Sequence, residues 1–208
     1  AGERPVIEVT DVGSPEPVYS ASGADLRIDL PRYRVFRKGE LVEEPTDIKA
    51  YWRDDLVVFL IGCSFTFESA LLEAGVPIRA IEMGIGTCDY VTSIRCRPAG
   101  KFHGPMVVSM RPMTPQQAIR ATQVTTRFSS THGAPIHVGD PSVIGIEDIN
   151  KPTFGSPLVI KEGEVPVFWA CGITPQMVAL ESEVDFMITH KPGHLFITDL
   201  RDAEIALL

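Results

Sequence analysis

The stretch LVVFLIGCS, residues 56–64, joins a continuous apolar run to a glycine and a cysteine. Six consecutive apolar residues are typical of a strand that is buried on both faces, as in a parallel sheet. Apolar residues then recur at helical spacing over residues 67–74, a glycine follows as a stop, and residues 77–81 have the pattern of another strand. The stretch therefore predicts a β-α-β unit whose first turn carries Cys63.

A matching pattern occurs near the end of the chain. Residues 165–170 read as a strand, Cys171 and Gly172 form the turn, and Thr174 precedes a proline as expected at the start of a helix. Residues 186–189 read as the next strand. The two strand–cysteine turn–helix units predict an α/β protein with a doubly wound, mainly parallel sheet.

The sequence between these units has a different character. Its pattern predicts strands at residues 90–94 and 106–110, and a helix that starts at Thr114 with the capping-box residue Gln117 three positions later. We therefore expect a two-lobed chain. Residues 1–82 plus 165–208 form the α/β lobe with both cysteine turns, and residues 83–164 form a smaller inserted α+β lobe.

Composition narrows the class of protein. The 208 residues carry a net charge of −8, which argues against a nucleic-acid surface, and no apolar run approaches the length of about 20 residues that a membrane helix needs. The 4 cysteines include no CxxC pair, which argues against a disulfide framework or a zinc ribbon. We expect a cytoplasmic protein that binds neither nucleic acid nor membranes, with homo-oligomerisation left open.

The cysteine turns are the first candidate site. Ligands of open α/β sheets bind at the turns that follow the strands, and a helix N-terminus there lowers a thiol pKa and offers N–H groups to a carboxylate. Cys171 is the stronger candidate because Gly172 permits close backbone approach, whereas Cys63 could equally be a small buried cysteine. Beside Cys63, Ser64 is a helix cap or a substrate contact, and Glu68 is an acid or base or a complement to the helix dipole.

Four of the 5 histidines lie in two turns rich in glycine and proline. His132 and His137 share one turn with Asp140, and His190 and His194 share the other. The spacing of His190 and His194 would suit a helical metal site, but the intervening proline and glycine prevent a helix. We therefore rank proton transfer and hydrogen bonding above metal binding, and we predict neither a metal nor another cofactor.

Two arginines are candidates for binding a carboxylate. Arg97 and Arg111 each lie beside a strand end and a proline, and a guanidinium can hold a carboxylate through two hydrogen bonds. No GxGxxG, P-loop or GxSxG motif occurs, so neither a nucleotide-binding nor an α/β-hydrolase function has motif support.

Seven blocks of sequence carry a family resemblance. They are GCSFTFE (62–68), CRPAG (96–100), VSMRP (108–112), HGAP (132–135), GDP (139–141), FWACG (168–172) and THKPGH (189–194). In this order they resemble the D-glutamate cyclase-like hydro-lyases, from about residue 6 to residue 202. The resemblance implies a two-lobed α/β architecture. The sequence departs from the family pattern at Cys88 and Asp89 and at Ser93 and Arg95, which counts against Cys88 as a catalytic residue.

The leading hypothesis is a carbon–oxygen lyase that eliminates water from a small amino- or hydroxy-carboxylic acid, with D-glutamate and 5-oxoproline as one substrate and product. Cys171 and either His194 or His132 would transfer protons, and the N–H groups after the two cysteines would stabilise developing negative charge. The alternatives are a two-cysteine racemase or epimerase and a non-catalytic carboxylate-binding protein. We expect the site in the cleft between the lobes. Its candidate catalytic residues are Cys171, His194, His132, Cys63 and Glu68, and its candidate substrate-binding residues are Arg97, Arg111, Ser64, Gly172, His137, Asp140 and His190.

Overall fold

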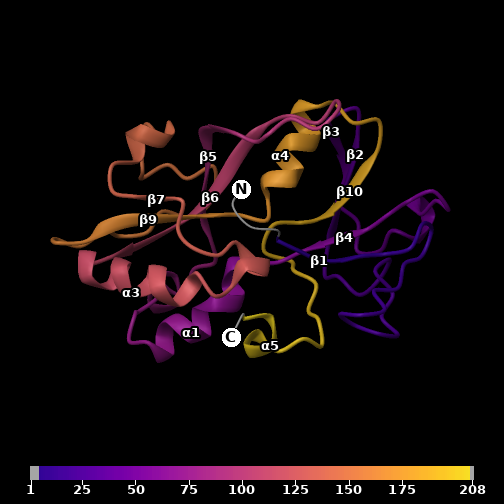
Figure 1. The fold of residues 1–208 in the computed structure, drawn as a ribbon. Helices are drawn as coiled ribbons and strands as arrows, with labels where there is room; N and C mark the ends of the chain where they lie inside the picture. Colours follow the sequence, from indigo (N-terminus) through magenta and orange to yellow (C-terminus); the bar gives the residue numbers. More distant parts are fainter. Residues whose placement is uncertain (1–4, 207–208) are drawn as a thin grey trace.

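The largest element of the fold is a five-stranded sheet in the order β7-β9-β6-β5-β8 (Figure 1). The structure is a computed structural model that describes residues 5–206. The central strand β6 pairs with β5 and β9 at its two edges, and it is buried along its whole length because hydrophobic clusters pack on both faces of the sheet. The strands of this sheet are β5 (Cys88–Arg95), β6 (Pro105–Met113), β7 (His137–Val138), β8 (Phe154–Gly155) and β9 (Val165–Ala170).

Two smaller sheets lie beside the large one. One pairs β1 (Val6–Val9) with β4 (Phe59–Ile61), and the other has the order β10-β2-β3, with β10 at Met187–His190. Strands β2 (Tyr33–Arg37) and β3 (Glu40–Glu43) pair antiparallel as a hairpin. Both residues of its turn have positive φ, the conformation that tight hairpin turns require.

The predicted doubly wound parallel sheet is wrong, although the chain does mix helices with strands. Every strand pair that the structure describes within residues 5–206 is antiparallel. Residues 77–81 were predicted as a strand, but residues 79–83 form the helix α2 (Arg79–Met83), which ends at Gly84 in the left-handed conformation. The apolar run at residues 56–61 gives only the three-residue strand β4 (Phe59–Ile61), in which Leu60 is buried and Phe59 is exposed, so the run correctly predicted neither burial on both faces nor strand direction. Five residues fill one helical turn as well as a short strand.

Two helices cover one face of the large sheet. Helices α1 (Glu68–Glu73) and α3 (Pro115–Thr125) pack against each other, and α3 packs against β9 (Figure 1). The predicted capping box of α3 is confirmed, because Thr114 Oγ1 accepts from the Gln117 N–H at 3.3 Å and Gln117 Oε1 accepts from the Thr114 N–H at 2.9 Å. The other helical segments are α4 (Thr174–Glu181), α5 (Asp202–Ile205) and 3-10 turns at Lys49–Tyr51, Ser64–Phe67, Ser129–Thr131 and Pro141–Ile144.

The start of α4 differs from the prediction. The helix has Ile173 at its N-cap, and Thr174 Oγ1 instead accepts from the Val107 N–H at 3.0 Å. The hydroxyl therefore ties the turn after β9 to the neighbouring strand β6. This contact between distant segments could not be read from the local Thr-Pro pattern.

The large sheet separates two hydrophobic clusters. Val167 and Trp169 face α1 and α3 on one side, whereas Met110 and Phe168 face the other side, because alternate residues of a strand point to opposite faces. The first face also carries the polar residues of the candidate site. The division of the chain into two lobes stays a prediction, and strands from both predicted parts, β6 and β9, are neighbours in this sheet.

Within residues 5–206 no helix is both long enough and apolar enough to cross a lipid bilayer.

Candidate functional site

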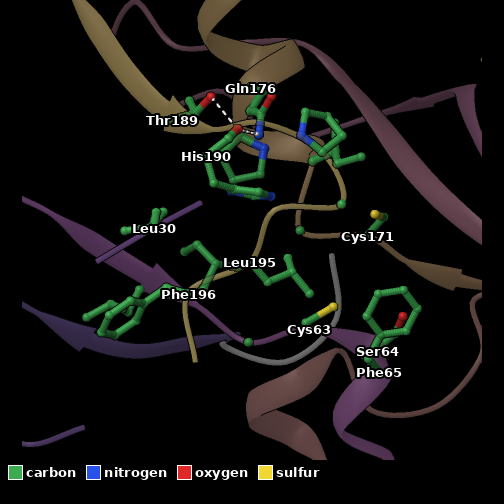
Figure 2. Close-up of a pocket in the computed structure, with 18 of the residues that line it drawn as sticks. Leu30, Cys63, Ser64, Phe65, Cys171, Gln176, Thr189, His190, Leu195 and Phe196 are labelled. Atoms are coloured by element: carbon green, nitrogen blue, oxygen red, sulfur yellow. Dashed lines mark hydrogen bonds between the residues drawn. The ribbon is translucent and has the colours of Figure 1, made fainter. Parts of the chain in front are cut away.

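Both cysteine turns line one cavity of about 720 Å³, a volume typical of small-molecule sites. Figure 2 shows Cys63 and Cys171 on neighbouring segments, with His190 on the segment above them and Leu195 and Phe196 on the opposite wall. The loop that follows β10 supplies this wall, so residues from the beginning, middle and end of the chain meet here.

The glycines next to the two cysteines pack against neighbouring segments. A β-carbon at Gly62 would lie 1.9 Å from the Ser130 carbonyl oxygen, so only glycine fits there. A β-carbon at Gly172 would lie 3.7 Å from the Gly62 carbonyl oxygen and 3.9 Å from His132 Nε2. The two turns and the loop that carries His132 therefore form one packed unit.

A row of polar side chains crosses the face of the sheet beside these turns. Asp89 of β5 pairs with Ser109 of β6, which in turn pairs with Trp169 of β9. Arg111 and Cys171 lie two residues further along their strands, so all of these residues share one face. Ser109 Oγ donates to Asp89 Oδ1 at 2.6 Å, and Asp89 is completely buried.

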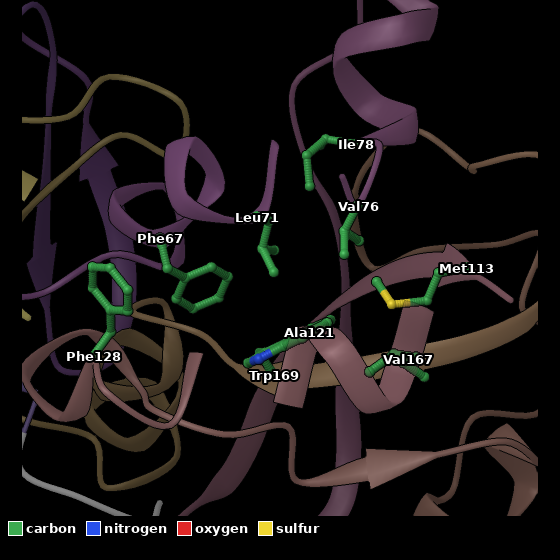
Figure 3. Close-up of a cluster of buried hydrophobic side chains, with 10 residues drawn as sticks. Phe67, Leu71, Val76, Ile78, Met113, Ala121, Phe128, Val167 and Trp169 are labelled. Carbon is green, nitrogen blue, oxygen red and sulfur yellow. The ribbon is translucent and has the colours of Figure 1, made fainter. Parts of the chain in front are cut away.

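Arg111 connects this row to the first cysteine turn. Its Nε and Nη2 donate to Glu68 Oε1 at 2.9 and 2.5 Å, and Nη2 also donates to Ser64 Oγ at 3.1 Å. The guanidinium carbon lies 5.2 Å from the ring centroid of Phe67 and 5.4 Å from that of Trp169. Both rings belong to the hydrophobic cluster in Figure 3, so the core holds the guanidinium in place.

Two polar atoms of this row have no partner among residues 5–206. They are Arg111 Nη1 and Asp89 Oδ2, and both are buried. Leaving a buried donor or acceptor of a charged group unpaired costs folding free energy, which is why most such groups are paired in native proteins. Both residues line the cavity, which makes the two atoms candidates for ligand contacts.

The two cysteines are neutral thiols at neutral pH, because their pKa values are raised. Burial raises the pKa of Cys171 to about 12, and the Asp89 carboxyl adds to this effect. Burial also raises the pKa of Cys63. In both turns the backbone N–H two residues after the cysteine acts in the opposite direction. The predicted lowering of the thiol pKa is therefore wrong, since the loss of hydration outweighs the helix N-terminus.

His132 lies directly behind the two turns and is buried. It has a positive φ of 82°, and within the described part of the chain neither ring nitrogen has a hydrogen-bond partner. Burial lowers the pKa of His132 to about 4, and the nearby Gly62 carbonyl only partly opposes this effect. His132 is therefore a neutral imidazole at neutral pH. It contacts the wall of the site without lining the cavity.

The lowered pKa of His132 predicts a loss of stability in acid. The unfolded chain protonates this histidine near its ordinary pKa of about 6.5, whereas the folded chain does so only near 4. The contribution is therefore complete above pH 6.5 and is lost as the pH falls toward 4, by on the order of 3 kcal/mol. We expect the free energy of unfolding, measured with urea at pH 7 and at pH 4, to fall less in His132→Asn than in the wild type.

Comparing these two proteins cancels the effect of Asp89, whose raised pKa acts in the opposite direction and is common to both. His103 is exposed, so His103→Asn serves as the matched control, and its free energy of unfolding should fall as much as that of the wild type between pH 7 and pH 4. An equal fall in His132→Asn and the wild type would contradict the prediction.

Seven of the predicted site residues line the cavity. Among them, burial lowers the pKa of His190, whose carbonyl accepts from Gln176 Nε2 at 3.4 Å and from Thr189 Oγ1 at 2.9 Å. Figure 2 shows these contacts on the segment above the cysteines. The seven residues are Cys63, Ser64, Glu68, Arg111, Cys171, Gly172 and His190.

Four other predicted residues lie outside the cavity lining, where three of them have local contacts. His137 Nε2 lies 2.7 Å from the Asp140 carbonyl oxygen, and Asp140 Oδ1 accepts from a backbone N–H in the following turn. His194 Nδ1 lies 3.2 Å from the carbonyl oxygen of Pro192. Arg97 is exposed.

Sequence reasoning missed Asp89, Ser109 and Gln176, which are buried and line the cavity. The available signal was the presence of polar residues inside apolar strands, since a buried polar side chain needs a partner or a function. Recognising the pair of Asp89 and Ser109 also required the register between β5 and β6.

The described residues include no group of three or more histidine, cysteine, aspartate or glutamate side chains arranged to hold a metal ion.

Comparison with known proteins assigns the chain to a family. A family model described as D-glutamate cyclase matches residues 57–199. A relative from Thermoanaerobacter sp. (strain X514) is 61% identical over 202 residues, which cover 97% of this chain and 76% of the relative. Relatives from Geobacillus kaustophilus (strain HTA426) and Stutzerimonas stutzeri (strain A1501) are 60% and 58% identical over 204 residues, which cover 98% of this chain and 78% and 77% of the relatives.

All three relatives are named as a "Putative hydro-lyase". The family model covers well over half of this chain, and the alignments span nearly all of it. This chain therefore belongs to the D-glutamate cyclase family.

Proposed function

We propose that this chain is a carbon–oxygen lyase that releases water from a small carboxylic acid, and that D-glutamate, cyclised to 5-oxoproline, is its substrate. The names of its relatives and of its family support a hydro-lyase. The observation that carries the proposal is the buried polar row on one wall of the cavity. There, an unpaired guanidinium N–H of Arg111 lies on the same face as the neutral thiol of Cys171.

The reaction requires two proton transfers. The amine nitrogen of D-glutamate attacks the side-chain carboxyl carbon, a C–N bond forms, a C–O bond breaks, and the oxygen leaves as water. Two protons move in total from the ammonium nitrogen to the departing oxygen. A neutral side chain can relay each proton, because it gives its own proton to the oxygen and takes one from the nitrogen.

Cys171 fits the role of this relay. Its raised pKa keeps the thiol protonated at neutral pH, so that it can donate a proton to the departing oxygen. A thiolate formed in this buried place is a strong base and recovers a proton from the substrate nitrogen. Arg111 is held by Glu68 and Ser64 and keeps one N–H for a substrate carboxylate.

A second candidate function is racemisation or epimerisation by the two thiols. The observation that favours it is that both sulfurs belong to one cavity and that Cys63 influences the pKa of Cys171. In this reaction one thiolate removes the proton at the substrate α-carbon and the other cysteine returns a proton to the opposite face. No water is released.

A single experiment separates these candidates. The purified protein is incubated in deuterated buffer with ¹³C-labelled D-glutamate, in parallel with L-glutamate, and both reactions are followed by NMR. We expect the carbon signals of 5-oxoproline from D-glutamate, with hydrogen retained at the α-carbon. Deuterium at the α-carbon without lactam formation would favour the racemase, and binding without any conversion would contradict both enzymatic proposals.

A further inference from the structure

The row of polar residues contains one unpaired hydrogen-bond acceptor and one unpaired hydrogen-bond donor. Asp89 Oδ2 can only accept a hydrogen bond when the carboxyl is ionised, and Arg111 Nη1 can only donate one. Among the ion pairs of residues 5–206, Arg111 pairs with Glu68 and not with Asp89. Ser109 donates a hydrogen bond to Asp89 Oδ1, and Thr87 and Cys171 also act on the carboxyl to lower its pKa, but Oδ2 has no hydrogen-bond partner among residues 5–206. The site therefore holds an acceptor and a donor that do not satisfy each other.

The sheet fixes the spacing of these two groups. Asp89 lies directly across from Ser109, and Arg111 follows Ser109 by two residues on the same face of β6. Two residues along a strand span about 6.8 Å and neighbouring strands lie about 4.8 Å apart, so the Cα atoms of Asp89 and Arg111 are roughly 8 Å apart. The ammonium and carboxylate of an α-amino acid are attached to one carbon, so a single ligand with a hydrogen bond at each end fits between two side chains that leave the same face of the sheet at this spacing.

We infer that Asp89 and Arg111 are a recognition pair for the zwitterion of an α-amino acid. Asp89 Oδ2 accepts from the α-ammonium group, and Arg111 Nη1 donates to the α-carboxylate. The inference rests on the proposed function only in placing the substrate in this cavity, and it narrows the substrate class from amino or hydroxy acids to amino acids. A 2-hydroxy acid offers no positive charge to Asp89.

Cys171 lies where this binding mode needs a proton relay. The Asp89 carboxyl and the Cys171 thiol influence each other's pKa, so the two groups face the same small volume. An ammonium group held by Asp89 therefore lies beside the thiol that would take its proton.

Calorimetric titration of the wild type with two probes tests the inference. The probes are D-glutamate and D-2-hydroxyglutarate, which differ in the amino group alone. The hydroxy acid lacks the charged hydrogen bond from the ammonium group to Asp89, and the loss of such a bond lowers affinity by a factor of about 10 to 100. We expect D-glutamate to bind more tightly than the hydroxy acid by this factor, and Asp89→Asn to reduce the preference to less than about threefold.

A matched variant serves as the control. Asp11 is exposed and lies outside the cavity, so Asp11→Asn should keep the wild-type preference. Equal affinity of the wild type for both probes, absence of binding, or an unchanged preference in Asp89→Asn would overturn the inference. If Asp89→Asn does not fold, the comparison of the two probes on the wild type still decides.

The binding test and the activity test can refute the two proposals independently. A preference for D-glutamate without any lactam would refute the proposed lyase and leave the recognition pair supported. Lactam formation with equal binding of both probes would support the lyase and refute the recognition pair.

Discussion

Replacing Cys171 with alanine is expected to lower the rate of 5-oxoproline formation from D-glutamate by about 10²- to 10⁴-fold, the range typical of a lost general acid or base. The protonated thiol lies beside Asp89 on the wall of the cavity, and alanine has no proton to give or take. The rate is measured by NMR at saturating substrate. Because alanine is smaller and apolar, the fold should survive, which circular dichroism and the urea midpoint of unfolding would verify.

Cys96 provides the matched control. It is half-buried, packs against the second hydrophobic cluster and does not line the cavity. Cys96→Ala should keep turnover within about twofold of the wild type. Wild-type turnover in Cys171→Ala would remove Cys171 from the mechanism.

Replacing Glu68 with alanine is expected to destabilise the protein by about 3–5 kcal/mol, because it leaves a buried positive charge without its partner. Only 5% of the Arg111 side chain and 13% of the Glu68 side chain are exposed. Urea unfolding at pH 7 measures the change in the free energy of unfolding. The same substitution at an exposed ion pair should cost about 1 kcal/mol or less, and Glu181→Ala, which breaks the pair with Arg95, tests this.

A double variant separates the charge effect from the loss of packing. Glu68→Leu with Arg111→Met replaces the buried pair by apolar side chains of similar size, and such replacements are often neutral or stabilising. We expect this variant to recover most of the stability lost in Glu68→Ala while remaining inactive, since it has no group for the substrate carboxylate. A Glu68→Ala variant as stable as the wild type would show that solvent reaches Arg111.

These expectations depend on contacts between segments that are distant in the sequence. The strand of residues 165–170 and the turn at Cys171 were correctly predicted, because the apolar run and the glycine are local signals. Asp89 was not predicted as a site residue, since nothing near it in the sequence shows that it lies opposite Ser109. Arg97 and Arg111 have similar local sequences, yet only Arg111 lines the cavity.

The sequence by itself determined the short-range features of this protein. The capping box at Thr114, the hairpin of β2 and β3, and the ordered motif blocks that place the chain in its family all follow from neighbouring residues. Local hydrogen bonds and φ preferences decide such features before the chain is packed.

Only the tertiary structure decided the direction of the strands and the chemistry of the cysteines. An apolar run is equally compatible with parallel and antiparallel neighbours, and the three sheets are antiparallel because of which strands meet. The cysteine turns are real, but Cys63 and Cys171 are protonated thiols, because packing takes each of them partly out of water. Burial is a property of the whole fold, and here it outweighs the local effect of a helix N-terminus.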